Sequence, residues 1–284
     1  MDLATSYRLC QKITRREAKN FYYAFITLPR EKRRAIYAVY AFCREADDIA
    51  DAVSTIEEKS SKLDALRSRL GRACSGDPQG GADIALADTI ARFGIDPKDL
   101  SHVIDGVEMD LVTSRYETFA DLQIYCQRVA SAVGLSVLPI LAGGGGRLPA
   151  EAREAGETLG LGMQLANIVR DVAEDITIDR VYIPQADLRR FQVTEEMLRE
   201  GTMNDSMRAL LSFESKRALS YMHEGEHVSE YLPRNARGCI MILSRIYTRI
   251  LEMAEARNYD VFKERLSLSS RQKVALILRT WFER

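Results

Sequence analysis

The chain has 284 residues, and its 40 basic and 41 acidic side chains give a formal net charge of -1. This balance offers no global attraction to nucleic acid or to an anionic membrane, and we expect no nucleic-acid partner. The five cysteines are scattered singly without a C-x-x-C pair, which argues against a disulfide framework and a cysteine-rich zinc site. We therefore expect a reducing, cytoplasmic compartment.

The N-terminal segment contains no apolar run of the kind found in a secretory signal. The most apolar stretch, 129–142, is shorter than the roughly 20 residues that a spanning helix needs, and it contains Gly134 and Pro139. The sequence therefore predicts no transmembrane span.

Apolar residues recur at steps of three and four, the spacing of amphipathic helices, for example over 33–53 and 160–176. No comparable stretch alternates apolar and polar residues as a half-buried strand would. Breakers rich in glycine and proline divide the chain at 75–81, 94–97, 143–149 and 232–235. None is long enough for a disordered interdomain linker. The sequence predicts one all-α domain, 1–284.

The first acidic cluster is Asp47-Asp48-Ile-Ala-Asp51. Asp47 and Asp51 lie four residues apart, so both carboxylates project from one helical face, with Arg44 a turn earlier on that face. Their repulsion is tolerated more readily with a cation between them, and hard oxygen ligands of this kind suit magnesium. Taken alone, this cluster fits a solvated acidic face better than a metal site.

The second cluster forms a polar stripe over three helical turns. Its members follow at steps of three, four and four: Gln164, Asn167, Asp171 and Asp175. Apolar residues border the stripe instead of lying opposite it: Leu161, Leu165, Ile168 and Val172. A surface helix would turn its polar residues away from its apolar face, so this pattern indicates a polar edge that faces an interior pocket.

Two such helices facing each other would gather more negative charge than a pocket holds alone. Magnesium, or manganese in its place, commonly binds one or two carboxylates together with substrate phosphate, so metal ions bridged by a diphosphate would meet this requirement. Arg44, Arg170 and Arg180 could bind the diphosphate oxygens through bidentate forks. Each arginine fits a surface ion pair with a neighbouring carboxylate equally well.

A third motif, His223-Glu-Gly-Glu-His227, matches the H-E-x-x-H pattern of zinc metalloproteases. Gly225 weakens the helix that would hold both rings on one face, and no further histidine follows downstream as a third ligand. The sequence therefore disfavours zinc at this position.

The segments 41–51 and 164–175, followed by Asp179-Arg-Val-Tyr-Ile-Pro184, resemble the two signature regions of the squalene and phytoene synthase family. The resemblance runs through most of the chain and includes 21–25, 28–30, 109–111, 115–116, 125–134, 259–262 and Arg265. Within the family, 125–134 is more similar to bacterial presqualene diphosphate synthases of the hopanoid pathway than to phytoene synthases.

The resemblance implies an isoprenoid synthase α-fold and the magnesium-dependent, head-to-head condensation of two farnesyl diphosphates to presqualene diphosphate. The metal ligands that it implies are Asp47, Asp48, Asp51, Asn167, Asp171 and Asp175. Catalytic roles fall to Asp47, Asp51, Asp171, Asp175 and Tyr40. The implied substrate-binding residues are Phe21, Asn20, Arg44, Gln164, Arg170, Arg180, Tyr182, Tyr259 and Arg265.

The positions of Tyr40 and Asn20 indicate what each of these two implied residues would do. Tyr40 lies seven residues before Asp47 on the same helical face, so it is expected to line an apolar cavity with Phe21 and Phe25 and to present its ring to positive charge. Asn20 stands where many relatives carry a serine-rich segment, so its amide replaces a hydroxyl as the expected donor to diphosphate.

The sequence leaves several points open. A 20-carbon substrate would make the enzyme a phytoene synthase, and the reaction could stop at the cyclopropyl diphosphate or proceed to squalene or dehydrosqualene, with or without NADPH. An alternative of another class is a non-catalytic helical assembly factor that keeps the fold. We expect isoprenoid diphosphates as partners and a peripheral membrane contact for product release, while the oligomeric state stays open.

Overall fold

The computed structural model describes residues 1–18, 21–146 and 148–282. The described chain is all-α, as predicted, and its regular elements follow in this order: α1 (Leu3–Glu17), α2 (Phe21–Phe25), α3 (Arg30–Asp51), α4 (Ile56–Cys74), α5 (Asp83–Phe93), α6 (Pro97–Val112), α7 (Phe119–Cys126), η1 (Gln127–Ser131), α8 (Ala132–Ala142), α9 (Ala150–Asp175), η2 (Ile176–Ile178), α10 (Gln185–Arg190), α11 (Glu195–Glu200), α12 (Asp205–Gly225), η3 (Glu226–Tyr231), α13 (Arg234–Ala256) and α14 (Ser270–Phe282).

Side-chain caps fix where several helices begin. Thr55 and Glu58 form a reciprocal capping box at the start of α4, and Thr118 and Asp121 form another at the start of α7. Such caps satisfy amide groups that the first turn of a helix leaves without partners. Each cap therefore helps to fix the start of a helix on one side of the bundle.

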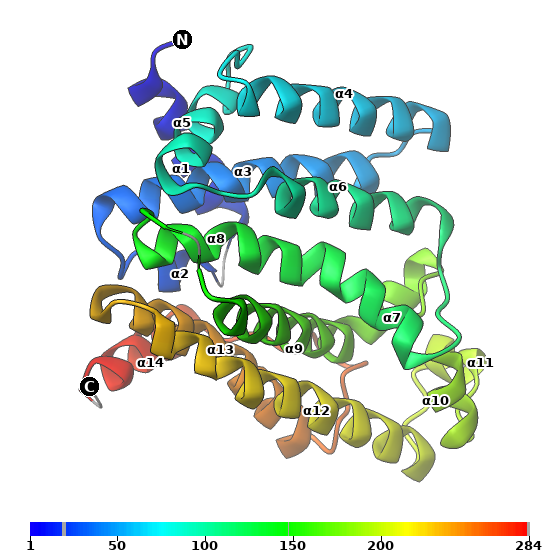
Figure 1. The fold of residues 1–284 in the computed structure, drawn as a ribbon. Helices are drawn as coiled ribbons and strands as arrows, with labels where there is room; N and C mark the ends of the chain where they lie inside the picture. The colour runs from blue at the N-terminus through cyan, green and yellow to red at the C-terminus, as the bar shows by residue number, and fades with distance from the viewer. Residues whose placement is uncertain (19–20, 147, 283–284) are drawn as a thin grey trace.

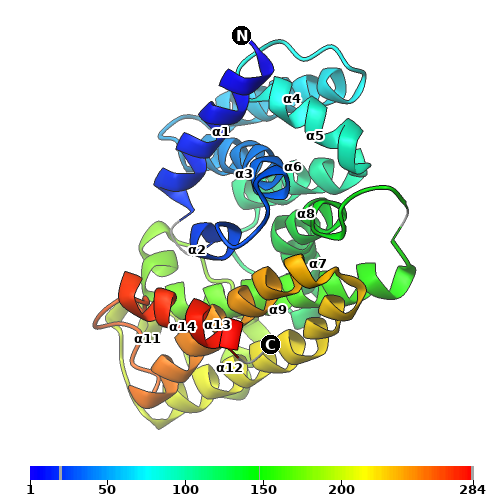
Figure 2. The same ribbon diagram turned by 90° about the vertical axis from the view of Figure 1, so that its left-hand side faces the viewer.

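The helices stack in successive layers, from α4 and α5 through α3 and α6 to α8, then α9, and finally α12 and α13 (Figures 1 and 2). The short helix α2 lies between the layer of α3 and the pair α13 and α14 (Figure 2). This arrangement encloses α9 within the bundle, so a polar stripe on α9 can face inward.

The continuous helical stretch from α7 to α8 contains a π-helical turn, η1. Two glycines allow neighbouring helices to approach this turn closely. A Cβ atom on Gly106 of α6 would lie 2.6 Å from Val129, and one on Gly160 of α9 would lie 2.7 Å from the Cα atom of Ser131. The π turn is therefore packed closely between α6 and α9. Single π turns inside α-helices are frequent at functional sites.

Lys32 ties three helices together at the end of the bundle away from Asp47. Its Nζ atom donates to the carbonyl of Leu141 at the end of α8, at 2.6 Å, and to Oδ1 of Asn235 on α13, at 3.2 Å. Burial lowers the pKa of Lys32. Its hydrogen bonds satisfy the C-terminus of α8 and join it to the start of α13, which holds this end of the bundle together.

One helical stretch among the described residues, Phe119–Ala142, is long and apolar enough to cross a bilayer by length and composition. Of its most apolar window, 56% is buried inside the protein. Leu138 and Leu141 on this stretch are 2% exposed. The stretch therefore packs as a core helix of the bundle.

Candidate active site

The bundle encloses a cavity of about 280 Å³ whose walls come from α2, α3, η1, α8, α9, η3 and α13. Most of the lining is apolar, including Val133, Val137, Met163 and Leu243. The polar lining residues are Arg44 and Asp47 on α3 and Gln164 and Asn167 on α9, with Tyr40 and Tyr247 beside them. The two helices that the sequence predicted to share a pocket therefore do so.

On the α3 side, Asp47 lines the cavity, and it is exposed to solvent although many protein atoms lie around its carboxylate. Enclosure raises the pKa of Asp47 to about 7, against the attraction of Arg44 and with added repulsion from Asp51 and Asp110. Arg44 forms its ion pair with Asp48, which is exposed. Within the described part of the chain, Asp47 therefore has no ion-pair partner.

On the α9 side, Asp171 is already neutralised by two arginines. Nε of Arg170 donates to Oδ1 of Asp171 at 2.7 Å, and Nε of Arg265 donates to the same oxygen at 3.1 Å. Arg265 also lies 3.2 Å from Glu174. Although Arg265 stands 94 residues away in the chain, the fold brings it to Asp171. The family resemblance implied Arg265 as a substrate-binding residue.

The amides of the α9 stripe form a pair at the cavity. Nδ2 of Asn167 donates to Oε1 of Gln164 at 3.2 Å. The Oδ1 atom of Asn167 is buried and has no hydrogen-bond partner among the described residues. A buried oxygen of this kind is costly unless a ligand completes it.

Asp110 on α6 is a candidate site residue that pattern reasoning did not select. Its carboxylate accepts from the hydroxyl of Tyr182 at 2.9 Å and from that of Tyr125 at 3.0 Å. Its charge raises the pKa of Asp47 on α3 and of Asp175 on α9, so it lies between the two acidic helices. Burial in turn raises its own pKa, against the attraction of Arg180.

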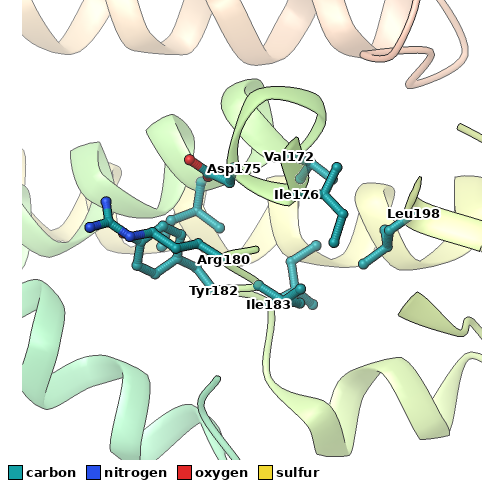
Figure 3. Close-up of a pocket in the computed structure, with 9 residues that line it drawn as sticks. Val172, Asp175, Ile176, Arg180, Tyr182, Ile183 and Leu198 are labelled. Atoms are coloured by element: carbon teal, nitrogen blue, oxygen red, sulfur yellow. The ribbon is translucent and has the colours of Figure 1, made fainter. Parts of the chain in front are cut away.

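Asp175 and Arg180 lie at the polar end of a small second pocket of about 10 Å³ (Figure 3). Figure 3 shows their polar ends on one side and the apolar side chains of Ile176 and Leu198 on the other. Burial raises the pKa of Asp175 to about 7, with added repulsion from Asp171 and an opposing attraction from Arg180. The guanidinium of Arg180 also donates to the backbone carbonyl of Asp110, at 3.4 Å.

Aromatic rings gather at the cavity close to its polar residues. The ring of Phe21 lies 6.4 Å from that of Tyr40, 6.2 Å from that of Tyr247 and 5.9 Å from that of Phe25. All four residues line the cavity. Tyr247, which is 2% exposed, was not selected by pattern because a single aromatic residue on α13 is indistinguishable from core.

The remaining predicted residues occupy different positions. Asp51, at the end of α3, is exposed, and its charge acts on Asp47 and Asp110. Tyr259 packs partly buried against the core and is not among the residues that line the cavity, as far as the described chain shows. Asn20 lies outside the described residues.

The two histidines of the H-E-x-x-H motif do not form a zinc site in the described chain. Helix α12 ends at Gly225, so His223 and His227 belong to successive helical segments. Nδ1 of His227 lies 2.9 Å from Glu230. A Cβ on Gly225 would lie 2.4 Å from the Cα atom of Leu159, so this glycine serves the close packing of α12 on α9.

The site fits magnesium only in combination with a substrate. Among the described residues, no group of three or more His, Cys, Asp or Glu side chains is placed to hold a metal ion alone. Magnesium typically keeps several waters and takes one or two carboxylates together with phosphate oxygens. Asp47 in the cavity wall, with the buried Oδ1 of Asn167 lacking a partner in the described structure, suits this mode of binding.

Comparisons with known proteins agree with this geometry. Residues 14–272 match the model of the squalene/phytoene synthase family. The chain belongs to this family. It is 36% identical over 280 residues to the 15-cis-phytoene synthase of Synechococcus elongatus, across 96% of this chain and 91% of that protein. It is 37% identical to the 15-cis-phytoene synthase of Synechocystis, across 97% and 84%.

Two solved structures are similar over most of the chain. A dehydrosqualene synthase in complex with a ligand has a TM-score of 0.91 at 30% identity and covers 99% of this chain and 97% of its own. The squalene synthase HpnC from Alicyclobacillus acidocaldarius has a TM-score of 0.84 at 29% identity, with coverages of 90% and 95%. The family makes this chain a prenyltransferase among the head-to-head isoprenoid synthases, so the alternative of a non-catalytic assembly factor falls away.

Proposed function

We propose that the chain joins two farnesyl diphosphates head to head and releases one diphosphate, giving presqualene diphosphate. The observation that carries this proposal is the cavity itself, which is apolar along its length and has acidic, amide and arginine side chains at one end. Such a cavity suits a ligand with a long hydrocarbon chain and a charged head. The similarity to a dehydrosqualene synthase and a squalene synthase, both at about 30% identity, also supports a 15-carbon substrate.

The charged end would bind the two diphosphates. Magnesium would be held by Asp47, Asp51, Asn167, Asp171 and Asp175, where it would neutralise the leaving diphosphate. Arg44 and Arg180 lie beside these carboxylates and can donate to diphosphate oxygens. Arg170 and Arg265 already pair with Asp171, so their part is to orient that carboxylate.

The apolar part of the cavity would protect the cation that forms when diphosphate leaves. The double bond of the second farnesyl chain donates its electron pair to the allylic cation, and loss of a proton from the resulting cation closes the cyclopropane ring. Walls built from residues such as Val133, Val137 and Leu243 exclude water, which would otherwise capture the cation. The rings of Phe21, Tyr40 and Tyr247 line the same space and can stabilise positive charge through their faces.

A second candidate is the coupling of two 20-carbon geranylgeranyl diphosphates, since the two cyanobacterial relatives are phytoene synthases. The cavity wall on α3 runs from Asp47 to Ile36, which is about 16 Å at the rise of an α-helix. Ile36 and Leu141, both at most 2% exposed, line the cavity at its far end. The length of the hydrocarbon chain that this end of the cavity accepts distinguishes the two candidate reactions.

The test is mass spectrometry of the products formed from each substrate with magnesium. Purified protein is incubated with farnesyl diphosphate, with geranylgeranyl diphosphate and with an equimolar mixture, each with and without NADPH. We expect release of diphosphate and a C30 product from farnesyl diphosphate. Preferential formation of phytoene from the mixture would favour the second candidate, and no turnover of either substrate would reject both.

A further inference from the structure

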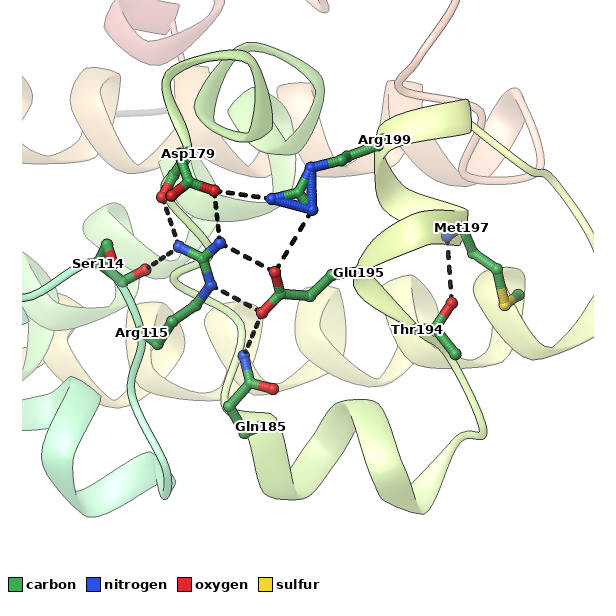
Figure 4. Close-up of polar contacts among 8 residues, drawn as sticks. All are labelled: Ser114, Arg115, Asp179, Gln185, Thr194, Glu195, Met197 and Arg199. Carbon is green, nitrogen blue, oxygen red and sulfur yellow. Dashed lines mark hydrogen bonds and ion pairs between the residues drawn. The ribbon is translucent and has the colours of Figure 1, made fainter.

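Arg115, in the segment between α6 and α7, uses its whole guanidinium in hydrogen bonds (Figure 4). Its Nε atom donates to Oε1 of Glu195 at 2.7 Å, and Nη2 donates to Oε2 of Glu195 at 2.9 Å and to Oδ1 of Asp179 at 2.7 Å. Nη1 donates to the carbonyls of Ser114 and Asp179. All five N–H groups of the side chain are therefore occupied.

The arginine holds a turn with an unfavourable backbone conformation. Asp179, which follows η2, has a φ of 59°, in the left-handed region that residues other than glycine seldom adopt. Its carbonyl and its carboxylate both accept from Arg115, and Arg199 donates to the same carboxylate oxygen at 2.7 Å. A strained turn persists when its surroundings fix it from several sides, as these three contacts do.

The residues that follow this turn are the ones that reach the candidate site. The amide of Arg180 donates to the carbonyl of Asp175 at 2.9 Å, and its guanidinium donates to the carbonyl of Asp110. The amide of Val181 donates to the carbonyl of Ser114 at 2.9 Å, the residue next to Arg115. Asp179 thus points outward to Arg115, while Arg180 points inward to Asp110.

We propose that Arg115 is a positioning residue for the diphosphate end of the site. It fixes the turn at Asp179, and this turn determines where the guanidinium of Arg180 lies relative to Asp110 and Asp175. The inference rests on the proposed function, in which Arg180 donates to diphosphate. Within the described residues, the hydrogen bonds of Arg115 reach none that lines the large cavity, so its effect on diphosphate binding passes through Arg180.

The protein offers a matched control, an arginine whose ion pair is structural and lies away from the candidate site. Arg153 on α9 forms a two-pronged pair with Asp99 on α6, at 2.9 and 3.2 Å, and its side chain is 35% exposed compared with 25% for Arg115. Neither Arg153 nor Asp99 lines the cavity. Arg153→Ala therefore removes a comparable ion pair without touching the turn at Asp179.

The experiment is a double-mutant cycle read by calorimetric binding of inorganic diphosphate in the presence of magnesium. We expect Arg180→Ala to weaken binding about ten- to a hundredfold, the usual effect of losing a hydrogen bond to a charged group. We expect Arg115→Ala to weaken it about three- to tenfold. The double variant should bind within about twofold of Arg180→Ala alone, because Arg115 acts through the side chain that is already missing.

Three outcomes would overturn the inference: independent, multiplicative effects of the two substitutions, an equal loss of binding in Arg153→Ala, or a wild-type protein that does not bind diphosphate with magnesium. If Arg115→Ala does not fold, Arg115→Lys serves, since it keeps the charge but cannot reach all five acceptors. A wild-type protein that binds diphosphate, shows the coupling and yet turns over no isoprenoid diphosphate would reject the proposed function and leave the role of Arg115 intact.

Discussion

The two acidic helices that face the cavity differ in how their charges are compensated. On α9, Asp171 is paired with Arg170 and Arg265. On α3, Asp47 has neither a hydrogen bond nor an ion pair with any described residue, because the nearest arginine, Arg44, pairs with Asp48. The protein therefore supplies partners for Asp171 on one helix, while Asp47, which lines the cavity on the other helix, is left for a ligand.

This difference indicates which carboxylates depend most on a bound cation. Asp171 has two arginine partners within the protein, whereas desolvation raises the pKa of Asp47 and of Asp175 to about 7. Unpaired carboxylates with raised pKa values are tolerated at functional sites, where ligand binding is favoured at the expense of stability. Four substitution experiments can break or sharpen the comparison.

The largest effect is expected on turnover. Asp47→Asn and Asp171→Asn should each lower diphosphate release from farnesyl diphosphate by about a thousandfold, because each removes a charge from the proposed metal site. Circular dichroism should show unchanged helical content. Full activity in the double variant would reject the metal role of both residues.

The stability of the metal-free protein should then separate the two residues. Asp171→Asn leaves Arg170 and Arg265 with a weaker acceptor, so its melting temperature should fall by several degrees. Asp47→Asn removes an unpaired charge, so its melting temperature should stay level or rise. Thermal unfolding measured in EDTA tests this, and a fall of equal size in both variants would contradict the asymmetry.

The pH dependence of stability should report the unpaired carboxylates. Between about pH 4 and about pH 7 the folded chain keeps protons on Asp47 and Asp175 that the unfolded chain has lost, so the free energy of unfolding falls as the pH rises through this range. The slope of melting temperature against pH in EDTA should flatten in Asp175→Asn. An unchanged slope in that variant would show that the raised pKa does not contribute.

The smallest effect is expected at Asp48. Its side chain is 53% exposed and pairs with Arg44, outside the residues that line the cavity. An exposed pair contributes little, so Asp48→Asn should leave turnover within about threefold of wild type. A loss comparable to that of Asp47→Asn, measured in the same assay, would place Asp48 among the metal ligands.

Helical periodicity predicted from the sequence that one polar edge of α9 faces a pocket. Gln164 and Asn167 of that edge line the cavity, and the flanking Leu161 and Leu165 are 3% and 2% exposed. The same reasoning did not select Asp110 or Tyr247, because each is a single residue without a periodic partner on its own helix. Their roles depend on contacts between helices distant in sequence, which no local pattern encodes.

The glycine contacts around η1 have a consequence for how this enzyme can change. Because α9 meets the backbone of Ser131 at Gly160, and α6 packs tightly against Val129 and Arg128 at Gly106, the distance between these walls has little room to adjust by repacking. A wider or longer chamber must therefore come from trimming side chains such as Val137 or Met163, while the frame stays fixed. Divergence in product size is then open to single substitutions that leave the scaffold undisturbed.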